Sequence, residues 1–261
     1  MPKVSVIMCE YNTPLNVLDE AVNSILNQTF EDFEFIIIDD SVNGYFKDYS
    51  KKYNDSRIKV YSNNGNKGLV YSLNKAITYS HTDYLVRMDT DDISLPNRID
   101  VLYNEILSNP QFSVIGSSVI EFDNDGKNID RIIDIEYSTN DLINRRAPVH
   151  PSVIMKKQDI INVGGYKNFN RAEDFVLWCE LLLNDYRIKT IPQVLLMYRV
   201  SSSDYQKRIL RYRWGEIKAR YIYYRKMNAN LIQILSIGKS IIAGLAPKKI
   251  VYYYHILKNK Y

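Results

Sequence analysis

Hydrophobic and polar positions follow two alternating patterns over the first hundred residues. Short runs that are apolar at almost every position, and rich in β-branched residues, are typical of strands buried on both faces of a parallel sheet. Such runs predict strands at Val4–Met8, Phe35–Ile38, Ile58–Tyr61 and Tyr84–Met88. Between these runs, apolar residues recur at three- and four-residue steps, which indicates amphipathic helices. The alternation of strand and helix predicts a doubly wound α/β sheet.

The pattern changes after residue 110. In chain order we expect a strand at Phe112–Phe122, a turn at 123–126, a hairpin partner at Ile129–Tyr137, a loop at Ala147–Ser152, and strands at Val153–Lys156 and Val194–Val200. The segment from about Glu173 to Asn184 is apolar on most sides. This pattern predicts a buried helix in the second half of the chain.

Composition excludes several classes of protein. Of the 261 residues, 46% are hydrophobic and 25% are charged, which is typical of a folded domain and excludes a disordered chain or a collagen-like fibre. Two cysteines are too few for a disulfide scaffold, and three histidines argue against a histidine-based metal site. No uncharged apolar stretch reaches 18 residues, so we expect no membrane span. The short apolar run at the amino terminus lacks the features of a signal peptide.

Acidic residues gather where the predicted strands end. Glu10 follows the first strand, Asp39-Asp40 the second, and Asp89, Asp91 and Asp92 the fourth. Ligands of open α/β sheets bind beyond the carboxyl ends of the strands, and so many carboxylates would repel one another without a cation or hydrogen-bond donors. Because oxygen ligands suit hard cations, we expect Mg²⁺ or Mn²⁺ there. A structural alternative stays open, since an aspartate can also cap the next helix.

Short motifs follow one another in a fixed order along the chain. They are Val4–Met8 with Tyr11-Asn12, Ser24–Phe30, Phe35–Ser41, Asn66–Leu69 with Leu73-Asn74, Arg87–Asp92, and Glu173-Asp174 with Leu177-Trp178. In this order and spacing the chain resembles the family 2 glycosyltransferases, which have the GT-A fold. The resemblance covers about residues 3–200. It implies a mostly parallel, Rossmann-like central sheet with helices on both faces.

The resemblance also implies a nucleoside site at the ends of the first two strands. There Tyr11 would lie against the base, and Asp40, with Asp39, would accept hydrogen bonds from base or ribose. Lys67 and Gly68 would lie near the nucleotide, where glycine permits a close approach of the backbone. A plain loop turn accounts equally well for that last pair.

Asp89, Asp91 and Asp92 match the metal motif of the family. The resemblance implies that Asp91 and Asp92 hold a divalent cation on the diphosphate, with Asp89 beside the nucleotide. Such a cation acts as a Lewis acid on the leaving group. His150 could also reach the metal or the diphosphate, although a single histidine is more often structural.

Glu173-Asp174 matches the catalytic pair of the family. Inversion needs a carboxylate that takes the proton of the acceptor hydroxyl, and the resemblance favours Asp174 as this base, with Glu173 supporting it. The alternative is a pair of acids that stabilises a helix amino terminus. At Cys9 and Glu10 the chain departs from many relatives, which have proline and a small or apolar residue there. The added acid at Glu10 could alter the preference for base or ribose.

Charge is distributed unevenly along the chain. Residues 205–261 contain 13 Lys and Arg but one acid, Glu216, whereas the whole chain carries a net charge of +4. Basic residues beside Tyr and Trp suit an anionic membrane surface, so the tail predicts attachment at the cytoplasmic leaflet. Packing on the body or on a second subunit, which would give a homo-oligomer, is the alternative. No nucleic-acid motif is present.

We therefore predict a GT-A domain over residues 1–204, with a nucleotide-binding half at 1–110, an acceptor-binding half at 111–204, and a basic amphipathic helical tail at 205–261. The expected activity is metal-dependent, inverting transfer of one hexose from a nucleoside-diphosphate sugar, a UDP-sugar in our interpretation. The acceptor would be a hydroxyl of a glycan or lipid-linked oligosaccharide in surface polysaccharide synthesis. The protein would lie in the cytoplasm, at the inner face of the cell membrane.

Two alternatives remain open at this point. One is an inactive nucleotide-binding protein that tethers partners through its tail. The other is a sugar-1-phosphate nucleotidyltransferase, which needs a glycine-rich phosphate loop after the first strand. The segment Glu10–Pro14 lacks such a loop, and intact acids at the metal and base positions argue against the inactive protein.

Overall fold

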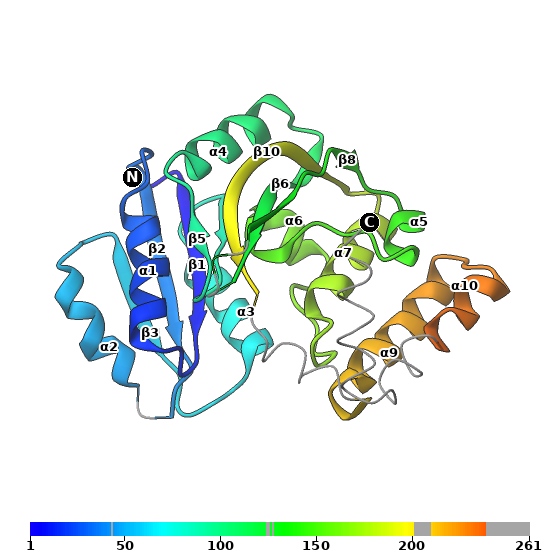
Figure 1. Cartoon of the computed structure of the whole chain (residues 1–261), viewed down its shortest axis with the longest axis horizontal. Helices are drawn as coiled ribbons and strands as arrows, with labels where there is room; N and C mark the ends of the chain where they lie inside the picture. Colours follow the sequence, from blue (N-terminus) through cyan, green and yellow to red (C-terminus); the bar gives the residue numbers. More distant parts are fainter. Residues whose placement is uncertain (43, 124–125, 127, 201–209, 239–261) are drawn as a thin grey trace.

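A mixed β-sheet, curled in its second half, crosses the molecule with helices on both faces (Figure 1). The computed structural model describes residues 1–42, 44–123, 126, 128–200 and 210–238. The strand order is β3-β2-β1-β4-β9-β6-β10-β5, with β7 beside β6 and β8 beside β10. The predicted fold class is confirmed.

The first half of the sheet is parallel. It consists of β1 (Val4–Glu10), β2 (Phe33–Asp39), β3 (Ile58–Ser62) and β4 (Tyr84–Arg87). All seven residues of β2 are buried, and so are all of β1 except Cys9, which explains why these strands read as continuous apolar runs. Their carboxyl ends share one edge, where the acidic residues lie.

The second half of the sheet mixes strand directions. It consists of β5 (Ile93–Ser94), β6 (Phe112–Phe122), β7 (Asn128–Arg131), β8 (Ile135–Glu136), β9 (Ile154–Lys156) and β10 (Arg187–Arg199). β9 is antiparallel to both β4 and β6, whereas β6 and β10 run parallel. The single hairpin partner predicted at Ile129–Tyr137 is wrong, because β7 pairs with β6 while β8 pairs with β10.

Helices divide the core into two clusters, one on each face of the sheet. α1 (Leu15–Leu26) and α4 (Arg98–Ser108) pack on one face. α3 (Leu69–Tyr79) and α7 (Glu173–Leu183) pack on the other. The shorter helices are α2 (Tyr45–Tyr49), η1 (Ser50–Tyr53), α5 (Thr139–Ile143), η2 (His150–Ser152) and α6 (Lys157–Asn162).

The predicted helix around Leu95 begins later than its apolar pattern suggests. β5 pairs with β10 directly after the aspartates, and α4 starts at Arg98 with Asn97 as its N-cap residue. The cap of this helix therefore does not account for Asp89, Asp91 and Asp92. These residues form a loop between β4 and β5 instead.

The described part of the basic tail packs on the body. α9 (Leu210–Lys226) and α10 (Leu231–Leu235) lie at the opposite end of the molecule from α2 (Figure 1). Tyr223 donates a hydrogen bond to Glu180 of α7, and Tyr224 donates one to the Ile143 carbonyl at 2.6 Å. Packing on the body, the alternative left open by the sequence, thus holds for α9. Residues 239–261, with their apolar and basic clusters, lie outside the described residues.

No helix among the described residues combines the length and the apolar character that crossing a membrane requires. The exposed apolar side chains of α9 and α10 are Trp214, Tyr221, Leu231, Ile232 and Leu235. They form a surface feature and not a span.

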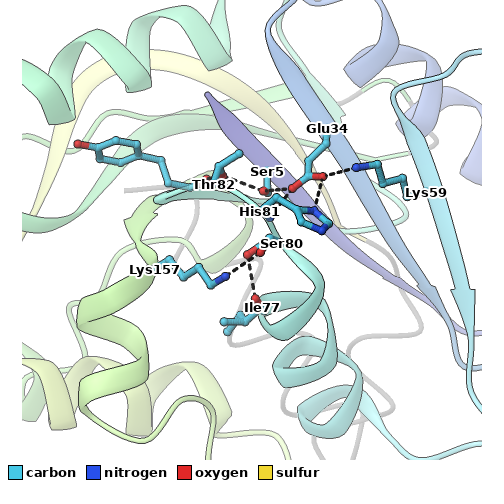
Figure 2. A network of polar contacts seen from close by, with 9 residues as sticks. Ser5, Glu34, Lys59, Ile77, Ser80, His81, Thr82 and Lys157 are labelled. Carbon is cyan, nitrogen blue, oxygen red and sulfur yellow. Dashed lines mark hydrogen bonds and ion pairs between the residues drawn. The ribbon is translucent and has the colours of Figure 1, made fainter. Parts of the chain in front are cut away.

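The amino-terminal ends of the parallel strands are joined by a polar network (Figure 2). Glu34, at the start of β2, is only 2% exposed and accepts hydrogen bonds from Ser5 of β1 at 2.7 Å and from Lys59 of β3 at 2.6 Å. The His81 backbone N–H donates to the same carboxylate at 2.6 Å. Burial alone would raise the pKa of Glu34, but these bonds lower it to about 2. The network therefore fixes the register of three strands from the end opposite the acidic edge.

Candidate active site

The end of β2 orders the loop that precedes α3. Asp40 is 3% exposed, and its Oδ1 accepts hydrogen bonds from the Asn63 side chain at 2.6 Å and from the Lys67 N–H at 2.8 Å. Its Oδ2 accepts from the Gly68 N–H at 2.8 Å. Gly68 has a φ of +86°, a left-handed conformation that favours glycine. The structure thus brings together the predicted residues Asp40, Lys67 and Gly68, and the half-exposed Tyr11 leaves its ring accessible.

Asp39 points to the other face of β2, where its carboxylate accepts hydrogen bonds from the turn before α2 and from α2 itself. Its Oδ1 accepts from the backbone N–H and the hydroxyl of Ser41, and its Oδ2 accepts from the N–H groups of Phe46 and Lys47 at 3.1 and 3.3 Å. Both oxygens are therefore used by the turn and the first residues of α2. This is the capping alternative that the sequence left open.

Glu10 connects three loops at the acidic edge. It is fully buried, and its Oε1 accepts hydrogen bonds from the Thr13 N–H at 2.9 Å and from the Tyr45 hydroxyl at 3.0 Å. The Thr13 hydroxyl donates at 2.8 Å to that of Thr90, which lies between Asp89 and Asp91 of the metal motif. Burial raises the pKa of Glu10, and its Oε2 has no hydrogen-bond partner. Glu10 therefore braces the loops around the nucleotide edge from beneath.

The end of β4 places three carboxylates above two buried arginines. Asp91 is exposed, Asp89 is 34% exposed and ion-paired with Arg87, and Asp92 is buried. Arg98 donates to the Arg87 carbonyl at 2.6 Å. Burial lowers the pKa of Arg98 to about 10, although the negative charge of Asp92 acts in the opposite direction. The guanidinium groups of Arg87 and Arg98 thus stabilise the loop from the protein interior.

The same loop suits a divalent cation. Asp92 accepts the Arg199 N–H through Oδ1 at 2.8 Å, but its Oδ2 is buried without a hydrogen-bond partner. Burial, with the charges of Asp89 and Asp91, raises the pKa of Asp92 well above its ordinary value. A cation would relieve this repulsion, so the residues fit Mg²⁺ or Mn²⁺. Among the described residues, no three His, Cys, Asp or Glu side chains form a complete protein-only site. A cation held by one or two carboxylates and substrate phosphates does not need one.

Asp174 begins the first turn of α7 together with Glu173. It is half-buried, and the Phe175 N–H donates to its Oδ1 at 2.7 Å. Burial, followed by the charge of Glu173, raises the pKa of Asp174 to about 6. A carboxylate with this pKa is ionised at neutral pH and still basic enough to accept a proton.

Tyr166 is buried beside His150, with charges of both β4 and α7 acting on it. Burial raises its pKa, and both the positive charge of Arg87 and the negative charges of Asp174 and Glu173 act on its phenol. The Tyr166 side chain is thus close enough to both β4 and α7 for their charges to act on it. The Tyr166 N–H also donates to Asn74 of α3 at 2.9 Å.

His150 is held within an aromatic group. Its Nε2 is 2.8 Å from the Tyr166 hydroxyl, and its ring makes edge contacts with Tyr166 and Trp178. Burial and the charge of Arg87 lower the pKa of His150 well below its ordinary value. These contacts support the structural interpretation of His150, and Trp178 is fully buried in the core as expected.

Sequence reasoning missed three arginines that shape the site. Arg87 and Arg98 underlie the aspartate loop, and Arg220 of α9 lies with its guanidinium 4.7 Å from the Phe175 ring centroid, next to Asp174. The signal for Arg87 was a charge inside an apolar strand run. Arg98 and Arg220 have the helical spacing of surface residues, and only the packing of α4 and α9 makes them internal.

The fold is the GT-A fold that the sequence predicts. S. aureus TarS residues 1–349 in complex with UDP-GlcNAc superimpose with a TM-score of 0.69 at 16% identity, over 93% of this chain and 71% of that chain. In a structure with a longer TarS chain, the covered share of that chain is 43%. This likeness concerns the fold.

Sequence comparison identifies the family. The model for "Glycosyl transferase family 2" matches residues 5–167, more than half of the chain, so the chain belongs to this family. An Escherichia coli enzyme named UDP-Gal:alpha-D-GlcNAc-diphosphoundecaprenol beta-1,3-galactosyltransferase is 34% identical over 94% of this chain and 92% of its own length. The putative glycosyltransferase EpsE of Bacillus subtilis is 29% identical over 97% and 93%. The predicted family is confirmed.

Proposed function

We propose that the protein is an inverting glycosyltransferase that moves one sugar from a UDP-sugar to a hydroxyl of a lipid-linked acceptor in surface polysaccharide synthesis. The observation that carries this proposal is Asp174, a half-buried carboxylate with a raised pKa in the first turn of α7. The names of the relatives support the substrate class, since one uses UDP-Gal and a diphosphoundecaprenol acceptor and TarS was solved with UDP-GlcNAc.

The nucleoside would bind over the ends of β1 and β2. Tyr11 offers an exposed ring for stacking on the base. The Asp40 carboxylate orders the backbone at Lys67 and Gly68, so a base could exchange hydrogen bonds with a loop that is already in place. A preordered loop lowers the entropic cost of binding.

Asp91 would hold the divalent cation from the protein side, with Asp89 and Asp92 completing the negative surroundings. Asp91 is the exposed member of the group and thus the one open to a cation shared with the diphosphate. When bound, the cation would supply Lewis-acid stabilisation of negative charge on the leaving UDP.

Asp174 would act as the general base. As the acceptor oxygen forms its bond to the anomeric carbon, the bond from that carbon to the UDP oxygen breaks and the configuration inverts. The hydroxyl proton passes to Asp174, and UDP leaves with the bonding electrons. Positioned proton transfer of this kind contributes about 10²–10⁴-fold to a rate. Glu173 keeps the base strong by repelling its ionised form.

The membrane surface would be met by the exposed apolar side chains of α9 and α10, which lie among basic residues such as Lys218 and Arg225. This composition suits the headgroup region of an anionic bilayer. Attachment would bring the site close to a lipid-linked acceptor.

The direct test is a panel of UDP, GDP, CDP, ADP and TDP, each with and without Mn²⁺, with thermal unfolding as the readout. A ligand that binds only the folded state raises its stability by RT ln(1 + [L]/Kd). We expect a Mn²⁺-dependent rise in Tm with UDP. The absence of a rise with every nucleotide would contradict the proposal, and a rise with another nucleotide alone would reassign the donor.

A further inference from the structure

Asn63 connects the nucleotide edge of β2 to the middle of α3. It follows β3 directly, and its backbone N–H donates to the Asp39 carbonyl at 2.8 Å, which extends the pairing of β3 with β2 by one residue. Its side-chain NH₂ donates to Asp40 at 2.6 Å and to the buried Ser72 hydroxyl of α3 at 2.9 Å. The amide therefore bridges a strand end and a helix.

Lys75 of α3 holds the other end of this amide. Its Nζ donates to Asn63 Oδ1 at 2.8 Å and to the Ser62 carbonyl at 2.9 Å, and it lies 5.8 Å from the Tyr79 ring centroid. An ammonium group has three N–H donors, and two of them are used in these bonds. Lys75 is half-buried, and a hydrogen bond from a charged donor is about twice as strong as one between neutral groups.

The two neighbours of the Asn63 amide fix which way it faces. An ammonium group can only donate, and an ionised carboxylate can only accept. The amide oxygen must then face Lys75 while the NH₂ faces Asp40, and the structure has this orientation. The reverse orientation would lose both bonds and bring the amide oxygen against the carboxylate. The amide therefore has one stable orientation.

Asp40 in turn is held by three donors. The Asn63 side chain and the Lys67 N–H share its Oδ1, whereas its Oδ2 accepts from the Gly68 N–H. A carboxylate oxygen has two lone pairs, so Oδ2 can accept one more hydrogen bond. In the proposed function, the base of the nucleotide supplies that donor. Uracil offers an N3–H, whereas the N3 atom of neutral cytosine carries no hydrogen and only accepts.

We propose that Lys75 is a positioning residue for the nucleoside. Through Asn63 it holds the Asp40 carboxylate in the orientation that accepts a hydrogen bond from the base, and this favours uracil over cytosine. Lys75 acts only through the amide and not on the phosphates of the donor. This inference rests on the proposed function for the identity of the donor, and it adds the residues that select the base.

The test is a double-mutant cycle on the full chain with Asn63→Ala, Lys75→Met and the combined variant. Titration calorimetry in saturating Mn²⁺ gives the Kd for UDP and for CDP. Each single variant should bind UDP about tenfold more weakly, the effect of losing one charge-assisted hydrogen bond, while the affinity for CDP should hardly change. The combined variant should bind UDP no more weakly than Asn63→Ala, because residues that act as one unit give non-additive losses.

Lys51→Met is the matched control, since Lys51 is an exposed lysine of η1 whose Nζ pairs with Asp48. It should bind UDP as the wild type does. A purely structural role of Lys75 would weaken UDP and CDP alike, and urea unfolding of the same proteins reports any loss of the fold. In sugar transfer, the variants should raise the KM for the UDP-sugar and leave kcat unchanged, because the amide does not touch the reacting atoms.

Equal UDP affinity of the wild type and both single variants would overturn the inference, and so would a wild type that binds CDP as tightly as UDP. Additive losses in the combined variant would overturn it as well, since Lys75 would then act on the nucleotide independently of Asn63. A wild type that binds no nucleotide would overturn the proposed function together with this inference. If the wild type binds UDP and the variants bind it equally well, only the role of Lys75 fails.

Discussion

At the scale of single residues, the proposed transfer depends on the ionisation of Asp174. Its pKa of about 6 implies that the base is charged at neutral pH and loses its function as the pH falls. We expect kcat for sugar transfer to be level above pH 7 and to drop about tenfold per pH unit well below 6. A pH–rate profile with a saturating UDP-sugar donor measures this. A rate that stays constant down to pH 5 would exclude a base with this pKa.

Glu173 offers an independent check of the same carboxylate. Its charge is the second cause of the raised pKa of Asp174, after burial. Glu173→Gln should therefore lower the pKa of Asp174 and shift the acid limb of the pH–rate profile to lower pH. A limb that does not move, or moves upward, would show that Glu173 does not act on the base.

Some site residues could be predicted from the sequence and others could not. Asp40 and Asp91 follow the ends of strongly patterned parallel strands, so topology alone brings them to one edge, and Asp174 stands at the start of an equally clear helix. Arg98 and Arg220 could not be placed, because a charged residue at helical spacing looks solvated until its packing partner is known. Asp39 also needed the structure, since only the hydrogen bonds of α2 separate its task from that of Asp40.

At the scale of elements, α9 positions the loop that leads to the proposed catalytic pair, Glu173 and Asp174. A Cβ at Gly215 would overlap the carbonyl oxygens of Phe169 and Asn170. Gly215→Ala should thus push the loop from α9, lowering stability by about 1–3 kcal/mol and kcat severalfold while leaving UDP affinity unchanged. Chemical denaturation and initial rates measure the two effects. Gly238→Ala, where no heavy atom lies within 4 Å of the added Cβ, is the control, and equal behaviour of both variants would contradict this role of α9.

β2 is secured by Glu34 at the end of the sheet far from the chemistry. Glu34→Gln should lower stability at pH 7 by about 1–3 kcal/mol, because charge-assisted hydrogen bonds to a buried carboxylate are lost. The stability that the ionised group provides is full above its unfolded pKa of about 4.3 and is lost as the pH falls toward 2. Urea unfolding should therefore show a difference between variant and wild type that shrinks from pH 7 to pH 3. A difference independent of pH would show that the charge of Glu34 does not matter.

The elements themselves differ in how well sequence defines them. β1 and β2 follow from unbroken apolar runs, whereas β10 begins at Arg187 and not at Val194. Pro192 lacks an N–H, and the pairing with β6 shifts its register between Ile191 and Val194. The residues before Val194 therefore do not show the regular pattern from which a strand is predicted. The sequence leaves the packing of α9 on the body as one alternative and does not decide it, because Tyr223 and Tyr224 are buried through hydroxyl hydrogen bonds to distant residues.

At the scale of the whole molecule, the proposed function puts nucleotide binding at one end and the acceptor and the membrane at the other. Ile232 and Leu235 of α10 are 80% and 66% exposed. Burying such a side chain in a bilayer gains about 1.5–3 kcal/mol, so Ile232→Asp with Leu235→Asp should weaken binding to vesicles rich in phosphatidylglycerol by at least about tenfold. Vesicle sedimentation measures this, with Val42→Asp, on the nucleotide half, as the control. Unchanged sedimentation of the double variant would remove the membrane role of α10.

In the proposed reaction, Asp174 takes the acceptor proton while the strand-end carboxylates hold the donor. The most direct measurement is the rate of sugar transfer by Asp174→Asn at saturating UDP-sugar, with the Kd for UDP determined on the same protein. We predict a rate lower by about 10²–10⁴-fold with an unchanged Kd. Transfer at the wild-type rate, or a loss of UDP binding in step with the loss of transfer, would contradict the account.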